Sequence, residues 1–108
     1  MRLRELDAEF IKRIDAQHFE FVDALAEADG IKFLCPKCFA ENKGPIGAHA
    51  VICWSPSVPQ DTRPTPGRWT MQGTSIDDLT LVAGSSSVAI LGGCKAHFFV
   101  RAGAIVDC

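Results

Sequence analysis

Apolar residues near the start of the chain recur at the spacing of a helix. The positions that form this stripe are Leu3, Leu6, Phe10 and Ile14. Intervals of three and four residues place side chains on one face of a helix. The pattern therefore predicts an amphipathic helix over roughly residues 1–16, with its apolar stripe packed on the core.

Residues 17–29 allow two interpretations. The stripe can be continued through Phe21 and Leu25 as one long helix, whereas Phe19-Glu20-Phe21 alternates as a short strand would. We favour a break near residue 17 and a second short helix from Asp23, a suitable N-cap, to Ala28. The pair Asp29-Gly30 would end this helix, so residues 1–29 are expected to form a helical segment.

After Gly30 the chain changes to short apolar runs separated by turn residues. Such runs predict strands, and the candidates are residues 31–34, 48–54, 79–82, 88–91 and 98–101. Ala102-Gly103 follows the last run and predicts a hairpin turn. Four prolines between Ser55 and Gly67 lack a backbone N–H and predict a surface loop. The expected fold class is α+β, with the helical segment packed on a small, mainly antiparallel sheet of residues 30–108, in a single domain.

Composition and charge exclude several classes of protein. The chain has 108 residues, of which 47% are hydrophobic and 22% charged, which argues against a disordered or multidomain protein. The longest uncharged run, residues 79–94, is interrupted by glycines and serines and predicts no transmembrane helix. Residues 1–29 hold eight acidic and four basic residues, within an overall net charge of −2. An acidic surface there disfavours nucleic acid and could meet a basic partner.

The compartment is predicted from the first residues and the cysteines. The segment MRLRELDAEF carries acids where a signal peptide needs an apolar stretch, which predicts a cytoplasmic protein. In a reducing compartment the five cysteines favour thiols or metal ligands over disulfides.

Two cysteine turns carry the clearest chemistry. Cys35-Pro36-Lys37-Cys38 is a C-x2-C motif, and Cys94-Lys95-Ala96-His97 is a C-x2-H motif. Two ligands three positions apart in a tight turn can hold one ion from the same side, and a second such turn completes a tetrahedron. Three thiolates and one imidazole favour Zn²⁺, and four protein ligands favour a structural site. The sequence therefore predicts a structural zinc bound by Cys35, Cys38, Cys94 and His97 in a zinc-ribbon-like sheet.

Other interpretations of these residues stay open. His49 is the alternative ligand, although it can equally be a hydrogen-bonded histidine beside the site. The cysteines could also be buried thiols that pack as small hydrophobes, or form a disulfide. Cys53, within the apolar run 50–54, is expected to face the core.

A second cluster places a cation, an indole and two acids close together in the sequence. Arg68 and Trp69 are followed by Asp77 and Asp78. They form a candidate interaction surface, because Trp and Arg are the side chains that most often anchor interfaces. In the structural alternative, Trp69 caps the core while Arg68 pairs with one of the two acids in a surface ion pair.

Several short motifs of the chain form a specific combination. They are FLCPKCF at residues 33–39, HAVICW at 49–54, PGRW at 66–69, DDLTL at 77–81 and GGCxxHxFVR at 92–101. Together they resemble a family of small phage and prophage proteins, a domain of unknown function whose members sometimes carry the label "ammonia monooxygenase". The resemblance implies a compact zinc-binding protein without an established activity. Ala96 and Phe98 stand where the family often has Trp and Gly, which leaves the ligands intact.

The expected function is that of a non-enzymatic protein-interaction module. The resemblance suggests a phage or prophage accessory protein that binds a host or phage protein in the cytoplasm of the bacterial host. Motifs of zinc deaminases, metalloproteases and P-loop proteins are absent. One alternative is a hydrolase-like zinc enzyme that uses His49 or Asp77/Asp78 near an open zinc site. The other is a nucleic-acid-binding zinc knuckle, which the pI of 5.8 disfavours. No feature indicates an oligomeric state.

Overall fold

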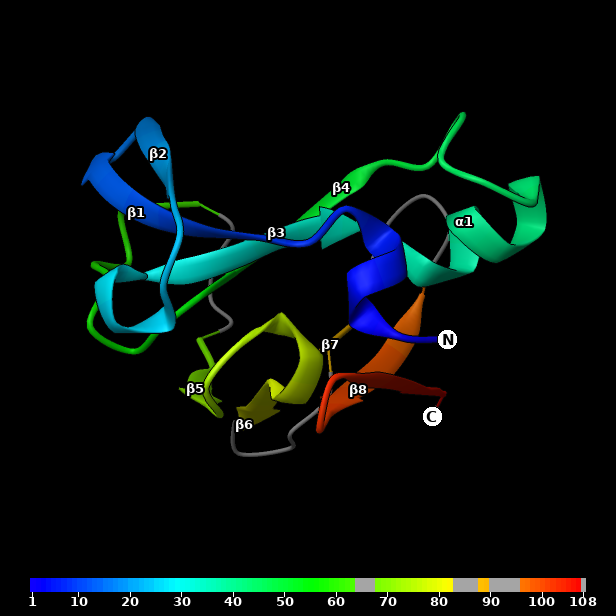
Figure 1. Cartoon of the computed structure of the whole chain (residues 1–108). Helices are drawn as coiled ribbons and strands as arrows, with labels where there is room; N and C mark the ends of the chain where they lie inside the picture. Colours follow the sequence, from blue (N-terminus) through cyan, green and yellow to red (C-terminus); the bar gives the residue numbers. More distant parts are fainter. Residues whose placement is uncertain (64–67, 83–87, 90–95, 108) are drawn as a thin grey trace.

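The largest unit of the fold is a four-stranded antiparallel sheet. The structure, a computed structural model, describes residues 1–63, 68–82, 88–89 and 96–107. The sheet has the strand order β2-β1-β3-β4 (Figure 1). Its strands are β1 (Glu9–Asp15), β2 (His18–Val22), β3 (Gly30–Leu34) and β4 (Ala50–Trp54).

Two smaller antiparallel sheets pack below it in the view of Figure 1. One pairs β5 (Thr70–Gln72) with β6 (Thr80–Val82), and the other has the order β7 (Val88–Ala89), β8 (His97–Arg101), β9 (Ala104–Asp107). The described helical segments are α1 (Pro36–Asn42) and the 3-10 helices η1 (Leu3–Leu6), η2 (Leu25–Glu27) and η3 (Ile76–Asp78). None of these has the length and apolar character that a membrane crossing requires.

The main core lies between the four-stranded sheet and the smaller sheets. Phe33 of β3 and Phe98 of β8 meet edge to face, with ring centroids 6.0 Å apart. Leu3 and Leu6 of η1 are fully buried in the same cluster. Segments from both ends of the chain therefore share one core, which holds the sheets together.

The predicted N-terminal helical segment is wrong, and so is the α+β fold class built on it. Within residues 1–16 only Leu3–Leu6 form a helical turn, and Asp7 adopts a left-handed backbone conformation (φ 51°) before β1 begins. Ile14, the fourth member of the supposed stripe, is 58% exposed. Phe10 and Ile11 are consecutive and both buried, which a strand achieves by pointing them to opposite faces.

The following segment, residues 17–29, also differs from the interpretation we favoured. Residues 18–22 form β2, so the alternation of Phe19-Glu20-Phe21 was the correct signal. The predicted helix from Asp23 to Ala28 is reduced to the short turn η2.

Most strand predictions after Gly30 are confirmed. Strands β3, β4, β6 and β8 lie within or overlap the predicted runs, and β7 covers the described part of residues 88–91. Ala102 and Gly103 form the β8–β9 hairpin turn, both with positive φ (48° and 77°), as a type I′ turn requires. In the proline-rich loop, residues 55–63 form turns and bends, and residues 64–67 lie outside the described residues.

Candidate metal centre

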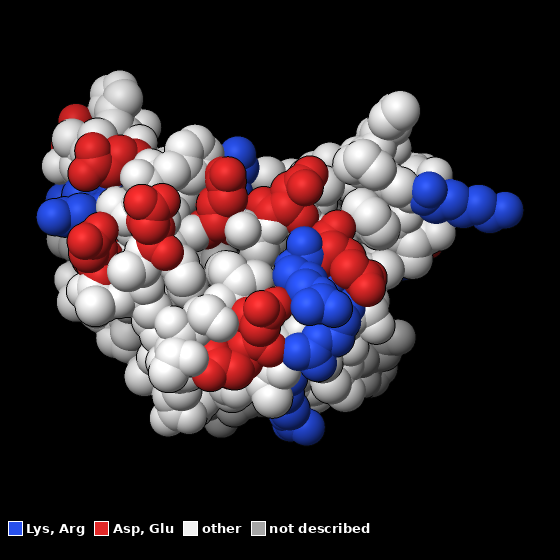
Figure 2. Space-filling model, viewed as in Figure 1, with Lys and Arg blue, Asp and Glu red and all other residues white. Residues whose placement is uncertain are grey.

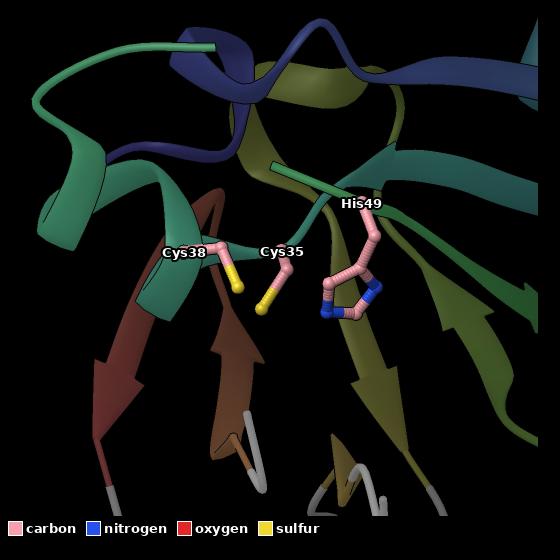
Figure 3. A group of neighbouring side chains, drawn as sticks. All are labelled: Cys35, Cys38 and His49. Carbon is pink, nitrogen blue, oxygen red and sulfur yellow. The ribbon is translucent and has the colours of Figure 1, made fainter. Parts of the chain in front are cut away.

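The C-x2-C motif lies where β3 passes into α1. Cys35 follows the last residue of β3 and is the N-cap of the helix. Pro36 occupies the first helical position, where its missing N–H costs nothing and its fixed φ suits the helix. Cys38 therefore falls in the first turn, on the same side as Cys35 (Figure 3). Cys35 is completely buried in the main core, whereas Cys38 is half-buried.

His49 is held opposite Cys35 by the pairing of β3 with β4. The register joins Leu34 to Ala50, and the backbone N–H of Cys35 donates to the carbonyl oxygen of His49 at 2.8 Å. The antiparallel hydrogen bonding between β3 and β4 thus continues one residue pair beyond the ends of the two strands. This bond brings His49 to the cysteine turn although residues 36–48 intervene.

The three side chains bring one donor atom each to a common space. The Sγ atoms of Cys35 and Cys38 and one ring nitrogen of His49 all lie within 4.8 Å of one another. Figure 3 shows both sulfur atoms and the imidazole directed toward one another. Around a tetrahedral zinc with Zn–S bonds of about 2.3 Å, neighbouring sulfurs are roughly 3.8 Å apart. Small side-chain adjustments would therefore suffice for this group to bind a metal ion.

A backbone carbonyl group lies beside the imidazole. The Nδ1 atom of His49 is 3.4 Å from the carbonyl oxygen of Ala50. Histidine ligands commonly direct their second ring nitrogen to a carbonyl oxygen, which fixes the tautomer and the orientation of the ring. In this arrangement Nε2 is the nitrogen that would face the ion.

The predicted ligands divide into three groups. Cys35 and Cys38 belong to the cluster, and so does His49, which was predicted only as an alternative ligand. His97 is the first residue of β8 and is exposed, and it is not among the donors of this cluster. Cys94 lies outside the described residues.

A signal for His49 was present in the sequence. Cys35 ends one apolar run and His49 begins the next. Antiparallel pairing of those runs places the end of the first opposite the start of the second. The spacing within the C-x2-C and C-x2-H motifs contains no information about that register.

Cys53 has a different environment from the cluster. It faces the main core from β4, as predicted, and burial raises the pKa of its thiol well above the ordinary value. A thiol with a raised pKa is a poor metal ligand, because the thiolate is the form that binds metals.

Arg68 and Trp69 contribute to packing of the fold. The guanidinium of Arg68 donates to the carbonyl oxygens of Val58, Pro59 and Thr62, at 2.8 to 3.1 Å. Trp69 is half-buried against the main core, and its backbone N–H donates to Trp54. These hydrogen bonds and contacts of Arg68 and Trp69 thus stabilise the loop that follows β4.

Asp77 and Asp78 lie in the exposed turn η3. The carboxylate of Asp78 accepts the backbone N–H groups of Thr74 and Ser75 at 2.8 Å and the hydroxyl of Thr74 at 2.7 Å. These bonds lower the pKa of Asp78. Asp77 lies 3.8 Å from Arg4 and accepts a hydrogen bond from Arg2 through its backbone carbonyl. Neither carboxylate belongs to the metal-binding cluster.

Comparisons with known proteins add no relative. No protein-family model matches the chain, and no curated protein or solved structure matches it either.

Proposed function

We propose that the protein binds one Zn²⁺ ion as a structural element and acts as a non-enzymatic protein-interaction module. The observation that carries the proposal is the convergence of two thiols and one imidazole within 4.8 Å. Thiolate and imidazole donors select zinc over hard cations such as Mg²⁺ or Ca²⁺. Cys94, from the second motif of the sequence, is proposed as the fourth ligand.

The surroundings of the cluster favour a structural role for the ion. Cys35 belongs to the main core, so an ion bound to it would join β3, α1 and the start of β4 to the rest of the fold. Two surface hollows, of about 430 and 540 Å³, are lined by other residues and do not include Cys35, Cys38 or His49.

The biological setting of the proposal comes from the motif resemblance. A small phage or prophage accessory protein in the bacterial cytoplasm would act by binding a host or phage protein. Exposed apolar side chains on the surface support a binding role, and Phe21 and Ile46 are among them.

A zinc enzyme is the second candidate. It is supported by the exposure of His49 and by a cluster of three donors, since catalytic zinc sites combine three protein ligands with a water molecule. In that case the fourth position would be open and Cys94 would not be a ligand.

Metal analysis together with cobalt substitution tests the proposal. The purified protein should contain one zinc per chain, and its Co²⁺ form should show the strong visible absorption of a tetrahedral thiolate site. Cys38→Ala should abolish that absorption, whereas Cys53→Ala, a change of a cysteine outside the cluster, should keep it. Metal-free protein would contradict the proposal. A cobalt spectrum that changes on adding azide would reveal an open position and favour the enzyme.

A further inference from the structure

The four-stranded sheet has an outer face that the main core does not cover. Ile31 and Phe33 of β3 point into the core, so Lys32 between them points to the opposite side. There its Nζ lies 5.4 Å from the ring centroid of Phe21 on β2. Ile52 is opposite Lys32 in the register of β3 and β4. Phe21, Lys32 and Ile52 therefore mark one surface, called here the outer sheet face.

The outer sheet face is only partly covered. Val58, in the loop after β4, packs on Ile11 and Trp54 at one end. Beyond this small cluster Phe21 remains 55% exposed. An apolar sheet surface left open in this way is a candidate for binding a partner.

Two hollows lie on this face. The first, of about 430 Å³, has an apolar floor that includes Phe19, Ile52 and Trp54. The second, of about 540 Å³, is lined by Lys32, Leu34 and Ala50 among others. Figure 2 shows the molecule hollowed along its upper edge, between one projection over β1 and β2 and another over the chain that follows α1. The face is thus concave, and its first hollow is lined mainly by apolar surface.

The second projection links this surface to the candidate metal centre. It contains the chain between α1 and β4, where Ile46 is 89% exposed. Cys38 lies in α1, which precedes that stretch, and His49 lies at its end. A bound ion would therefore hold this projection in place beside the outer sheet face.

The charged residues around the two hollows indicate the charge of the partner that would bind there. Asp15 and Asp61 border the first hollow beside Arg63, and Asp7 and Glu9 border the second beside Lys32. Acidic groups thus outnumber lysine and arginine two to one in each lining. Figure 2 shows acidic side chains in a row along the same side of the molecule. A second copy docked face to face would place these acids against one another, and a nucleic acid would bring further negative charge. A basic partner would instead be attracted.

We propose that the outer sheet face is a docking surface for a basic amphipathic helix of another protein. Its apolar residues would lie over Phe21 and Ile52 between the two projections, and its lysines or arginines would meet Glu9 and Asp15. This inference rests on the proposed role as an interaction module and supplies the chemistry of the partner. It uses the helix-in-groove mode of recognition, in which apolar anchors on one helix face enter a groove.

Titration with two designed helical peptides of equal length tests the surface. One is built of Leu and Lys and the other of Leu and Glu, and binding to the zinc-loaded protein is followed by amide chemical shifts and calorimetry. The Leu/Lys peptide should bind and shift the amides of Phe21, Lys32 and Ile52, while the Leu/Glu peptide should not. Phe21→Ser should weaken binding by about tenfold or more, as loss of an aromatic anchor does.

Matched variants separate the outer sheet face from general charge attraction. Ile14 is as exposed as Phe21 but lies at the register irregularity between Arg13 and Asp15, where it has no partner on β2, so Ile14→Ser should bind like the original chain. Glu9→Lys should weaken binding, whereas Glu41→Lys on α1 should have little effect. Melting curves and zinc content of each variant show that it is folded and loaded.

Three results would overturn the docking surface. They are equal binding of the Leu/Glu peptide, full binding by Phe21→Ser, and a dimer that Phe21→Ser dissociates, which would assign the face to a second copy. Any of these in zinc-loaded protein leaves the metal assignment standing. Loss of zinc from the original chain would instead count against the proposed function.

Discussion

Gly103 is the residue at which the β8–β9 hairpin meets the beginning of the chain. Its N–H donates to the carbonyl of Leu79 and its carbonyl accepts from the N–H of Leu3, both at 2.8 Å. It has a positive φ of 77°, and a Cβ atom there would overlap the backbone carbonyl of Asp77. A side chain at this position is therefore excluded both by conformation and by space.

Gly103→Ala should lower the free energy of unfolding by more than about 2 kcal/mol, because the overlapping atoms belong to backbone that cannot move aside cheaply. Gly44→Ala is the matched control. Gly44 also has positive φ (154°), but a Cβ there meets nothing within 4 Å. Urea denaturation measures both, and equal losses would show that the close approach to Asp77 has no energetic consequence.

Arg68→Ala should also destabilise the protein, by about 2 kcal/mol, because three hydrogen bonds to carbonyl oxygens of the loop are lost together. Arg63→Ala, which removes an exposed arginine of the same loop, should change stability little. Thermal melts of the two variants provide the comparison. If Arg68 serves only to bind a partner, its removal will leave the melting temperature unchanged.

Among the elements, η3 shows how a short turn is fixed by one carboxylate. Ser75 and Asp78 form a reciprocal capping box, and the hydrogen bonds that Asp78 accepts hold its pKa below the ordinary value of 3.8. A carboxyl with a lowered pKa in the folded state stabilises that state above its unfolded pKa. The contribution disappears as the pH falls through the folded pKa.

Asp78→Asn should therefore be less stable than the original chain at pH 6, and the difference should close toward pH 2. The urea midpoint measured at both pH values tests this. Asp77→Asn is the matched control, since within the described part of the chain the carboxylate of Asp77 makes one long contact, to Arg4 at 3.8 Å. A stability difference that stays constant with pH would refute the capping role of the charged carboxylate.

The elements also show which parts of the fold could be predicted from sequence. Runs such as 31–34 and 98–101 are short, apolar and bounded by turn residues, so local pattern was sufficient. Residues 9–15 were misassigned because Phe10 and Ile14 fit a helical stripe by coincidence. These residues form a strand because Ile11 packs in a second apolar cluster with Trp54, which is distant in the sequence. Local spacing contains no information about such a contact.

The candidate site was predictable to a similar extent. The turn Cys35-Pro36-Lys37-Cys38 is local, and the structure keeps its two thiols in one cluster. The position of His49 depends on the register of β3 with β4, a pairing between separate segments. Motif spacing therefore identified two members of the cluster, and strand register supplied the third.

At the scale of the whole molecule, the three sheets share one core, and the cluster lies at its edge. Cys35 is both a core residue and a member of the metal-binding group. Removal of zinc should therefore destabilise the core as well as the metal centre. A chelator such as EDTA should lower the melting temperature and reduce amide protection in β3, α1 and β4, as metal binding is linked to folding. Unchanged melting after the zinc has demonstrably left would show that the fold does not depend on the ion.

The most direct measurement is the zinc affinity of His49→Ala beside that of His97→Ala, determined by competition with a chromophoric chelator. We predict that His49→Ala weakens zinc binding by about a hundredfold or more, since a ligand is lost, while His97→Ala stays near the original value. Full affinity in His49→Ala, combined with a large loss in His97→Ala, would contradict the assignment of Cys35, Cys38 and His49 to one metal centre.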